Sequence, residues 1–218
     1  MEQIEFEESL KRIAEILIQP NPNIRDSIVL NEVSANQPYL ANATVVYFVL
    51  QSGGESTQAM QGFLSEATKI AMAHKNCKGI ISEGDRMILV YSTAFKEELN
   101  AALDDAARIR SLAMIVSKIG KPYGIDPIIV DVGMDYGLVE IHLMGHDENS
   151  RPIFAWRGDV IRKAQKNAED ANDELIISRS VWNNLTENNQ KLFTRQSVVT
   201  DNYRGKVINV MMNNWLTK

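Results

Sequence analysis

The sequence has few of the residues that cross-link or ligate. It holds one cysteine, Cys77, and three histidines without a metal-binding spacing. A single cysteine excludes an internal disulfide and a cysteine-rich zinc site, which suits a reducing compartment. No apolar run approaches the roughly eighteen residues of a membrane span, and the N-terminus is acidic where a secretory signal needs positive charge. We therefore expect a cytoplasmic protein without a membrane span.

An excess of basic residues is also missing. The chain has 23 Lys and Arg against 28 Asp and Glu, a formal net charge of −5. Without a positive field, DNA and RNA are not expected as partners, because phosphate-backbone binding depends on counterion release. What is present, 218 residues with 44% hydrophobic side chains, predicts one sizeable domain, or one domain plus a short appendage.

The hydrophobic pattern divides the chain into an N-terminal helical arm, residues 1–40, and a domain, residues 41–218. Residues 6–17 place their apolar side chains on one helical face, and Pro20 and Pro22 then end the helix. Such a stripe most often packs on its own domain, and binding of a partner helix is the alternative.

The domain alternates strand and helix patterns. The β-branched run 43–50 predicts a strand covered on both faces, and Gly53-Gly54 breaks it. The further elements are helix 57–74, hairpin strands 79–82 and 87–91, helix 97–119, strands 128–134 and 138–144, helix 159–171, strand 174–178, helix 180–185 and a closing hairpin within 198–210. Tight hairpins among the helices predict an α+β fold with a central mostly antiparallel sheet and helices on one face.

Two Gly-Asp pairs stand at element ends. Gly84-Asp85 lies at the tip of the first hairpin, where a plain turn is the favoured interpretation of the pair taken alone. Gly158-Asp159 precedes the helix that carries Arg162 and Lys166, so Asp159 is read as its N-cap and the two cations as a solvated basic face. Only the order of these features along the chain makes them informative.

That order, over about residues 43–193, resembles the class III nucleotidyl cyclase homology domain. The segment 79–90 is similar to the family's Lys-x-x-Gly-Asp hairpin, Gly133–Gly137 to its Gly-Ile-x-x-Gly strand, and 158–164 to its Gly-Asp-x-Val-Asn-x-Ala helix. The segments 134–137, 155–159 and 205–216 most resemble the bacterial pyrimidine (cytidylate and uridylate) cyclases of anti-phage signalling. The resemblance implies cyclisation of a nucleoside triphosphate to a 3′,5′-cyclic nucleotide that triggers a separate effector.

The same resemblance implies a two-carboxylate metal site for Mg²⁺ or Mn²⁺, since the ribose 3′ oxygen must be activated and the phosphate charge neutralised. One ligand is Asp85. The other belongs at Leu50, whose aliphatic side chain cannot ligate a hard cation. Glu83, on the same hairpin face as Asp85, is a weaker substitute, and nothing in the sequence brings Asp131 or Asp135 to the metals.

The substrate positions also depart from the family pattern. Arg162 stands where an asparagine meets the ribose, and Lys166 where an arginine meets the triphosphate. The purine-selecting Lys–Asp pair falls on Ile81 and Ala155, which excludes adenine selection by that route. Trp156, beside Ala155, is the third candidate substrate-binding residue. Related domains pair head to tail, which implies a homodimer with each site built from both chains.

Three functions follow as hypotheses. The first is a cyclase. The second is a catalytically inactive dimeric nucleotide-binding module that serves as a regulator, sensor or decoy partner in cyclase signalling. The third is a globular domain whose likeness to cyclases is only topological. The loss of a carboxylate at Leu50 favours weak or lost catalysis.

Overall fold

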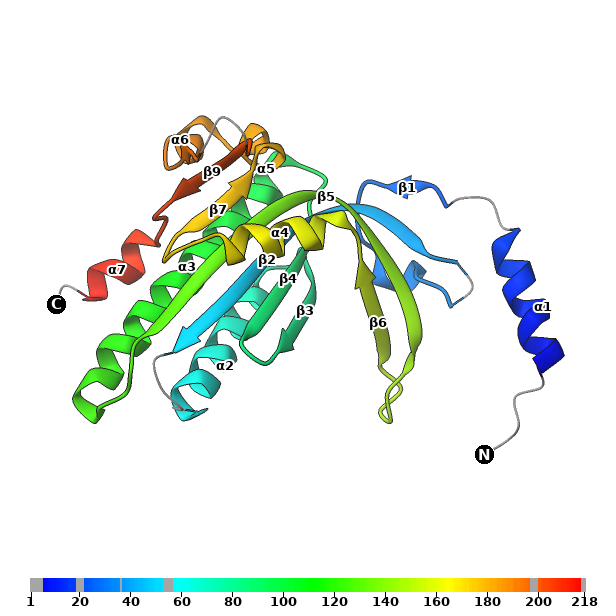
Figure 1. Cartoon of the computed structure of the whole chain (residues 1–218), viewed down its shortest axis with the longest axis horizontal. Helices are drawn as coiled ribbons and strands as arrows, with labels where there is room; N and C mark the ends of the chain where they lie inside the picture. The colour runs from blue at the N-terminus through cyan, green and yellow to red at the C-terminus, as the bar shows by residue number, and fades with distance from the viewer. Residues whose placement is uncertain (1–5, 19–21, 36, 53–56, 197–199, 217–218) are drawn as a thin grey trace.

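A computed structural model describes residues 6–18, 22–35, 37–52, 57–196 and 200–216 of the 218-residue chain. Figure 1 shows a central sheet flanked by helices, with the N-terminal helix set apart from it. The elements are α1 (Phe6–Leu17), β1 (Ile24–Arg25), β2 (Tyr39–Ser52), α2 (Thr57–Ala73), β3 (Cys77–Glu83), β4 (Arg86–Ser92), α3 (Lys96–Gly120), β5 (Ile128–His146), β6 (Pro152–Arg157), α4 (Asp159–Glu169), β7 (Leu175–Ser178), α5 (Arg179–Asn184), α6 (Glu187–Gln190), β8 (Thr194–Arg195), β9 (Asn202–Gly205) and α7 (Val210–Leu216), with short 3-10 turns at Leu30–Glu32 and Lys121–Tyr123.

The strands form one sheet in the order β3-β4-β2-β5-β7-β9-β8, with β1 added beside β2 and β6 beside β5. β2 lies between β4 and β5 and is antiparallel to both. The β5–β7 and β1–β2 pairs are parallel. The predicted α+β fold with a mostly antiparallel sheet is confirmed, and β2 is its central strand.

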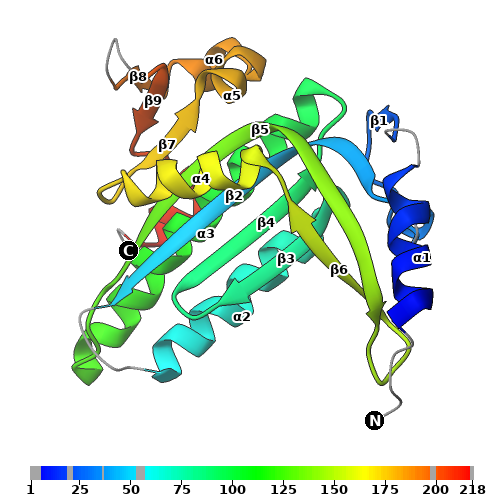
Figure 2. The same cartoon turned by 45° about the vertical axis from the view of Figure 1, so that its right-hand side comes forward.

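Side-chain alternation along β2 creates two apolar layers. Phe48 and its even-numbered neighbours pack against α2 and α3, on what we call the α2/α3 face. Tyr47 and its odd-numbered neighbours pack with α4, on what we call the α4 face. Figure 2 shows α2 behind the sheet and α4 across its front. The sequence predicted helices on one face, and α4 instead takes the other.

The position of α4 depends on Gly133. A Cβ at Gly133 would lie 2.0 Å from the carbonyl oxygen of Ala164 and 2.3 Å from the backbone nitrogen of Ala168. No side chain fits in that space, so the glycine allows helix and strand backbones to touch. Asn167 secures the contact, since its Nδ2 donates to the carbonyl oxygen of Met134 at 3.1 Å.

Three local expectations need correction. Residues 135–137 do not separate two strands, because β5 runs unbroken from Ile128 to His146, held extended by its register with β2. The N-cap of α4 is Gly158, with φ of 137°, and Asp159 is already helical. The closing hairpin pairs β8 with β9 and ends before α7; the predicted strand residues 198 and 199 lie outside the described residues, as does the Gly53-Gly54 break.

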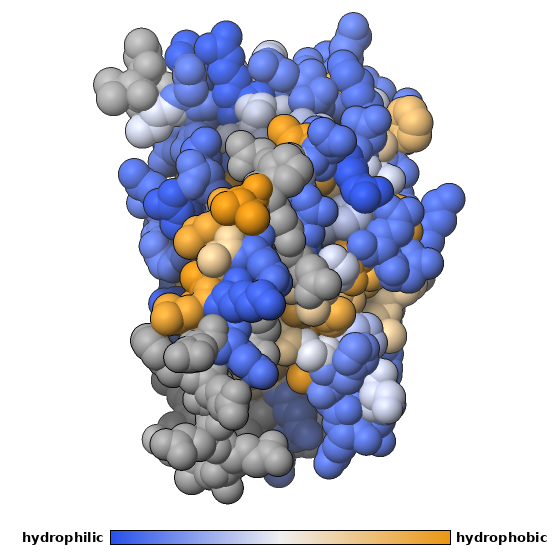
Figure 3. Space-filling view, turned by 90° about the vertical axis from the view of Figure 1, so that its right-hand side faces the viewer, coloured by the Kyte–Doolittle hydropathy of each residue, from blue (hydrophilic) through white to orange (hydrophobic). Residues whose placement is uncertain are grey.

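The predicted helix of the arm is present as α1, and its described side chains lie exposed. Leu10, Ile13 and Leu17 are 49%, 52% and 79% exposed. In the view onto the side where α1 lies, hydrophobic side chains gather in a band on a largely polar surface (Figure 3). The expectation that this stripe packs on its own domain is therefore wrong for the described residues of the helix.

Candidate nucleotide site

The β3–β4 hairpin places Asp85 beside the end of β2. Gly84, with φ of +60°, and Asp85 form its turn, and Glu83 pairs in register with Arg86. The backbone N–H of Leu50 donates to the carbonyl oxygen of Asp85 at 2.8 Å. The structure therefore brings together the two positions that the family resemblance assigns to the metal ligands.

The two side chains at these positions have opposite environments. Leu50 is 3% exposed and belongs to the apolar cluster of the α2/α3 face. The side chain of Asp85 is 66% exposed, and its Oδ1 lies 3.8 Å from Nε of Arg86. The site therefore has one exposed carboxylate, Asp85, which lies near Arg86, whereas the family resemblance implies two carboxylates.

The residues present do not fit a two-metal site. Among the described residues, no group of three or more His, Cys, Asp or Glu side chains is placed to hold a metal ion. Glu83 faces Arg86 across the hairpin, so any substitute carboxylate comes from the same hairpin as Asp85. The family resemblance assigns the ligands to both β2 and the hairpin, and β2 places the aliphatic Leu50 at its position.

Asp131 and Asp135 both accept hydrogen bonds from neighbouring parts of the fold. Asp131 is 2% exposed; its carboxylate accepts from Nε2 of Gln51 and from the backbone N–H of Asp173, both at 2.6 Å. Burial raises the pKa of Asp131 above its ordinary value. Asp135 accepts from Oγ of Ser180 at 3.0 Å. Both acids therefore tie β5 to neighbouring elements.

The predicted base-binding residues lie on two strands that meet across the α4 face. Ile81 is on β3, while Ala155 and Trp156 are on β6, which hydrogen-bonds to β5. A Cβ at Gly79 would lie 2.9 Å from Cζ2 of Trp156, so the indole rests directly on β3. Gly79 and Ile81 share one side of the strand because side chains alternate. The sequence missed this contact, although a glycine inside a strand signals a close approach.

Arg162 and Lys166 lie one turn apart on the exposed side of α4, opposite the residues that face β5. Arg162 forms an ion pair with Asp159 within the helix. Both side chains of that ion pair are exposed to solvent, so the interaction between them is weak. Both cations are available to an approaching anion.

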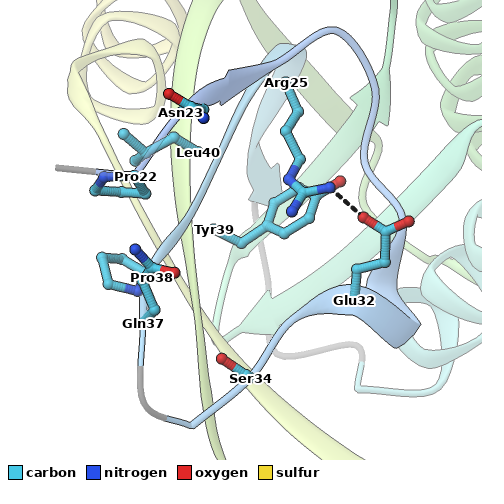
Figure 4. Close-up of a pocket in the computed structure, with 9 residues that line it drawn as sticks. All are labelled: Pro22, Asn23, Arg25, Glu32, Ser34, Gln37, Pro38, Tyr39 and Leu40. Atoms are coloured by element: carbon cyan, nitrogen blue, oxygen red, sulfur yellow. Dashed lines mark hydrogen bonds and ion pairs between the residues drawn. The ribbon is translucent and has the colours of Figure 1, made fainter. Parts of the chain in front are cut away.

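A cavity of about 550 Å³ lies at the opposite end of β2, in the arm (Figure 4). The guanidinium carbon of Arg25 lies 4.8 Å from the ring centroid of Tyr39, and Arg25 pairs with Glu32. The hydroxyl of Tyr39 donates to the carbonyl oxygen of Ser27 at 2.8 Å. Tyr39 begins β2 and Leu50 lies near its end, so this cavity is separate from the hairpin site.

Comparison with known proteins supports the resemblance. No protein-family model matches the chain. The uridylate cyclase of Treponema porcinum is 23% identical over 178 residues, in a match that covers 78% of this chain and 62% of that protein. The chain therefore spans less than two thirds of this curated relative.

Solved structures share the fold. The adenylyl cyclase CyaB from Pseudomonas aeruginosa has a TM-score of 0.64 at 15% identity, over 77% of this chain and 95% of that one. A class III adenylyl cyclase-like ATP-binding protein from the same organism has a TM-score of 0.69 at 13% identity, over 96% of this chain and 48% of that one. A guanylate cyclase domain from Catenaria anguillulae, in complex with GTP, has a TM-score of 0.56 at 16% identity, over 79% of this chain and 100% of that one. The predicted cyclase-type fold is confirmed. In the described residues, no helix is long and apolar enough to cross a membrane.

Proposed function

We propose that this chain, whose fold is that of the class III nucleotidyl cyclases, binds a nucleoside triphosphate with weakened or lost ability to cyclise it. The family chemistry is attack of the ribose 3′ oxygen on the α-phosphorus, with loss of the 3′ proton to solvent and departure of pyrophosphate. The single observation behind the proposal is Leu50, a buried aliphatic side chain at the position of a metal ligand. Any residual activity would use Mg²⁺ or Mn²⁺ at Asp85.

The other site residues receive roles by the same proposal. Lys166 contacts the phosphates, and Arg162 lies near the ribose or the charge of the transition state. Ile81, Ala155 and Trp156 border the base, which the uridylate cyclase relative suggests is a pyrimidine. Each site is completed by α4 of a second copy in a homodimer. The protein acts in the cytoplasm, in cyclic-nucleotide signalling of the anti-phage type with a separate effector.

The second candidate function is a regulatory or decoy module that binds nucleotide and makes no product. The likeness to a protein described as adenylyl cyclase-like and ATP-binding supports it, and that likeness covers 96% of the chain. Both candidates predict dimerisation and nucleotide binding. They differ in product formation alone.

Product analysis separates the two candidates. The purified protein is incubated with each of the four ribonucleoside triphosphates and Mn²⁺, and the products are separated by chromatography. A cyclic nucleotide that disappears in Asp85→Ala establishes the enzyme and sinks the inactive module. No product from the native chain, with product gained in Leu50→Asp, supports the inactive module.

A thermal-shift screen tests the proposal as a whole. Ligand binding raises apparent stability by RT ln(1 + [L]/Kd), so a bound triphosphate raises Tm. A chain that neither dimerises nor gains stability with any of the four nucleotides has only a topological likeness to cyclases.

A further inference from the structure

Arg86 directly follows the β3–β4 turn that carries Asp85. It is the first residue of β4 and pairs in register with Val49 of β2 and Glu83 of β3. It shares one side of β4 with Ile88, which packs on the α4 face. Its side chain is 48% exposed, and Nε lies 3.8 Å from Oδ1 of Asp85. A guanidinium thus stands beside Asp85, the carboxylate that remains of the proposed metal site.

The nearby charges decide how firmly Arg86 is held. The Asp85–Arg86 ion pair is long, and both of its side chains are exposed to solvent. Glu83 pairs in register with Arg86 across the hairpin. Exposed pairs of this kind contribute little, and either carboxylate can be replaced by another anion. Burial raises the pKa of Tyr47, and the charge of Arg86 and a side-chain hydrogen bond between Arg86 and Tyr47 oppose that rise. The buried Tyr47 of the α4 face is therefore a further partner of Arg86, and an uncharged one.

We propose that Arg86 binds the triphosphate directly, so that the chain binds nucleotide without a metal ion. This inference rests on the proposed function. A guanidinium forms two parallel hydrogen bonds to phosphate oxygens and keeps its charge at any physiological pH. The Arg86 guanidinium would thus provide, from the protein itself, the positive charge that divalent cations provide at a two-metal site. Asp85 and Glu83 then act as competitors of the phosphates for Arg86.

A one-metal site at Asp85, with help from Glu83, is the opposing arrangement, and it predicts the reverse response to loss of a carboxylate. With Arg86 as the phosphate ligand, Asp85→Asn removes a competing charge and tightens nucleotide binding. With a metal at Asp85, the same substitution removes a ligand and weakens binding. The sign of the change distinguishes the two.

Calorimetric titration of the full chain with UTP, CTP, ATP and GTP, each in EDTA and in Mg²⁺, tests the inference. We expect the best-bound nucleotide to have the same Kd in both solutions within about twofold. Arg86→Gln is expected to weaken binding about tenfold, and Arg86→Lys less, because lysine keeps the charge and loses the fork. Asp85→Asn is expected to tighten binding in EDTA.

Arg151→Gln is the matched control. Arg151 lies in the β5–β6 hairpin, is 74% exposed and likewise pairs with an aspartate, Asp147. It should leave Kd unchanged. Unfolding midpoints of all variants separate a lost contact from a lost fold, and Asp85→Asn tests the idea even if Arg86→Gln folds poorly.

The outcomes divide cleanly. Binding that requires Mg²⁺, or that weakens in Asp85→Asn, or that is unchanged in Arg86→Gln, overturns the inference and leaves the proposed function standing. Absence of binding to every nucleotide in both solutions overturns the proposed function and the inference together.

Discussion

The backbone N–H of Leu50 donates a hydrogen bond to the carbonyl oxygen of Asp85 at 2.8 Å, yet one side chain is buried in the core and the other is exposed to water. Leu50 is 3% exposed within an apolar cluster, and the side chain of Asp85 is 66% exposed. The two positions that the resemblance assigns to metal ligands are therefore neighbours in the backbone, while the side chain at one of them is part of the core. A carboxylate at that position has a cost in stability.

Leu50→Asp should lower the free energy of unfolding by about 3 kcal/mol, since it removes a buried aliphatic side chain and places a carboxylate in its stead. Mn²⁺ should recover part of the loss, because only the folded state brings residue 50 beside Asp85. Urea unfolding in EDTA and in Mn²⁺ measures both effects. Leu50→Asn is the control: it should be destabilised with little response to Mn²⁺. Equal responses would show that residue 50 does not approach a metal.

Gly133→Ala should destabilise the fold by about 3 kcal/mol, because the added Cβ would lie 2.0 Å from the carbonyl oxygen of Ala164 and backbone cannot rotate away. Gly62→Ala is the matched control. It lies within α2 with nothing inside 4 Å of the added Cβ, and should be stabilising by about 0.5–1 kcal/mol. Denaturant midpoints at constant m-value report both. A neutral Gly133→Ala would contradict the contact between α4 and β5.

Trp156→Ala should raise affinity for purine relative to pyrimidine nucleotides. The indole covers Gly79 on the strand that carries Ile81, so its removal opens space next to the proposed base site. The ratio of Kd values for GTP and UTP is the readout, with Trp215→Ala on α7 as the control. An unchanged ratio would remove Trp156 from base selection.

Asp105 should make the fold less stable as the pH rises. It is 4% exposed, accepts from the hydroxyl of Tyr91 at 3.2 Å, and burial raises its pKa above the ordinary 3.8. The folded state therefore binds more protons than the unfolded state between 3.8 and the raised pKa, and the free energy of unfolding falls as pH rises through that window.

Asp105→Asn should flatten this decline, because the amide still accepts the Tyr91 hydrogen bond and carries no charge. Urea unfolding from pH 4 to pH 7 measures the slope. Asp126→Asn, at an exposed position, should leave the slope as it is in the native chain. A native slope retained in Asp105→Asn would assign the dependence to another group.

Much of the fold was predictable because its signals are local. The continuous β-branched run of β2 and the period of 3.6 along α2 and α3 depend on near neighbours in sequence. The continuity of β5 was not predictable, because residues 135–137 resemble a turn in sequence. Only their pairing with β2 keeps them extended. The face chosen by α4 was likewise decided by Gly133, a contact between segments far apart in the chain.

The sequence by itself determined the central strand, the first hairpin and the helices α2, α3 and α4, together with the family likeness and the aliphatic residue at position 50. Those properties depend on residue identity and short-range spacing. Only the tertiary structure decided that Leu50 is buried in the core, that Trp156 rests on Gly79 and that Arg86 pairs in register with Val49 of β2. These facts depend on strand register and on close packing between distant segments, which no local pattern encodes.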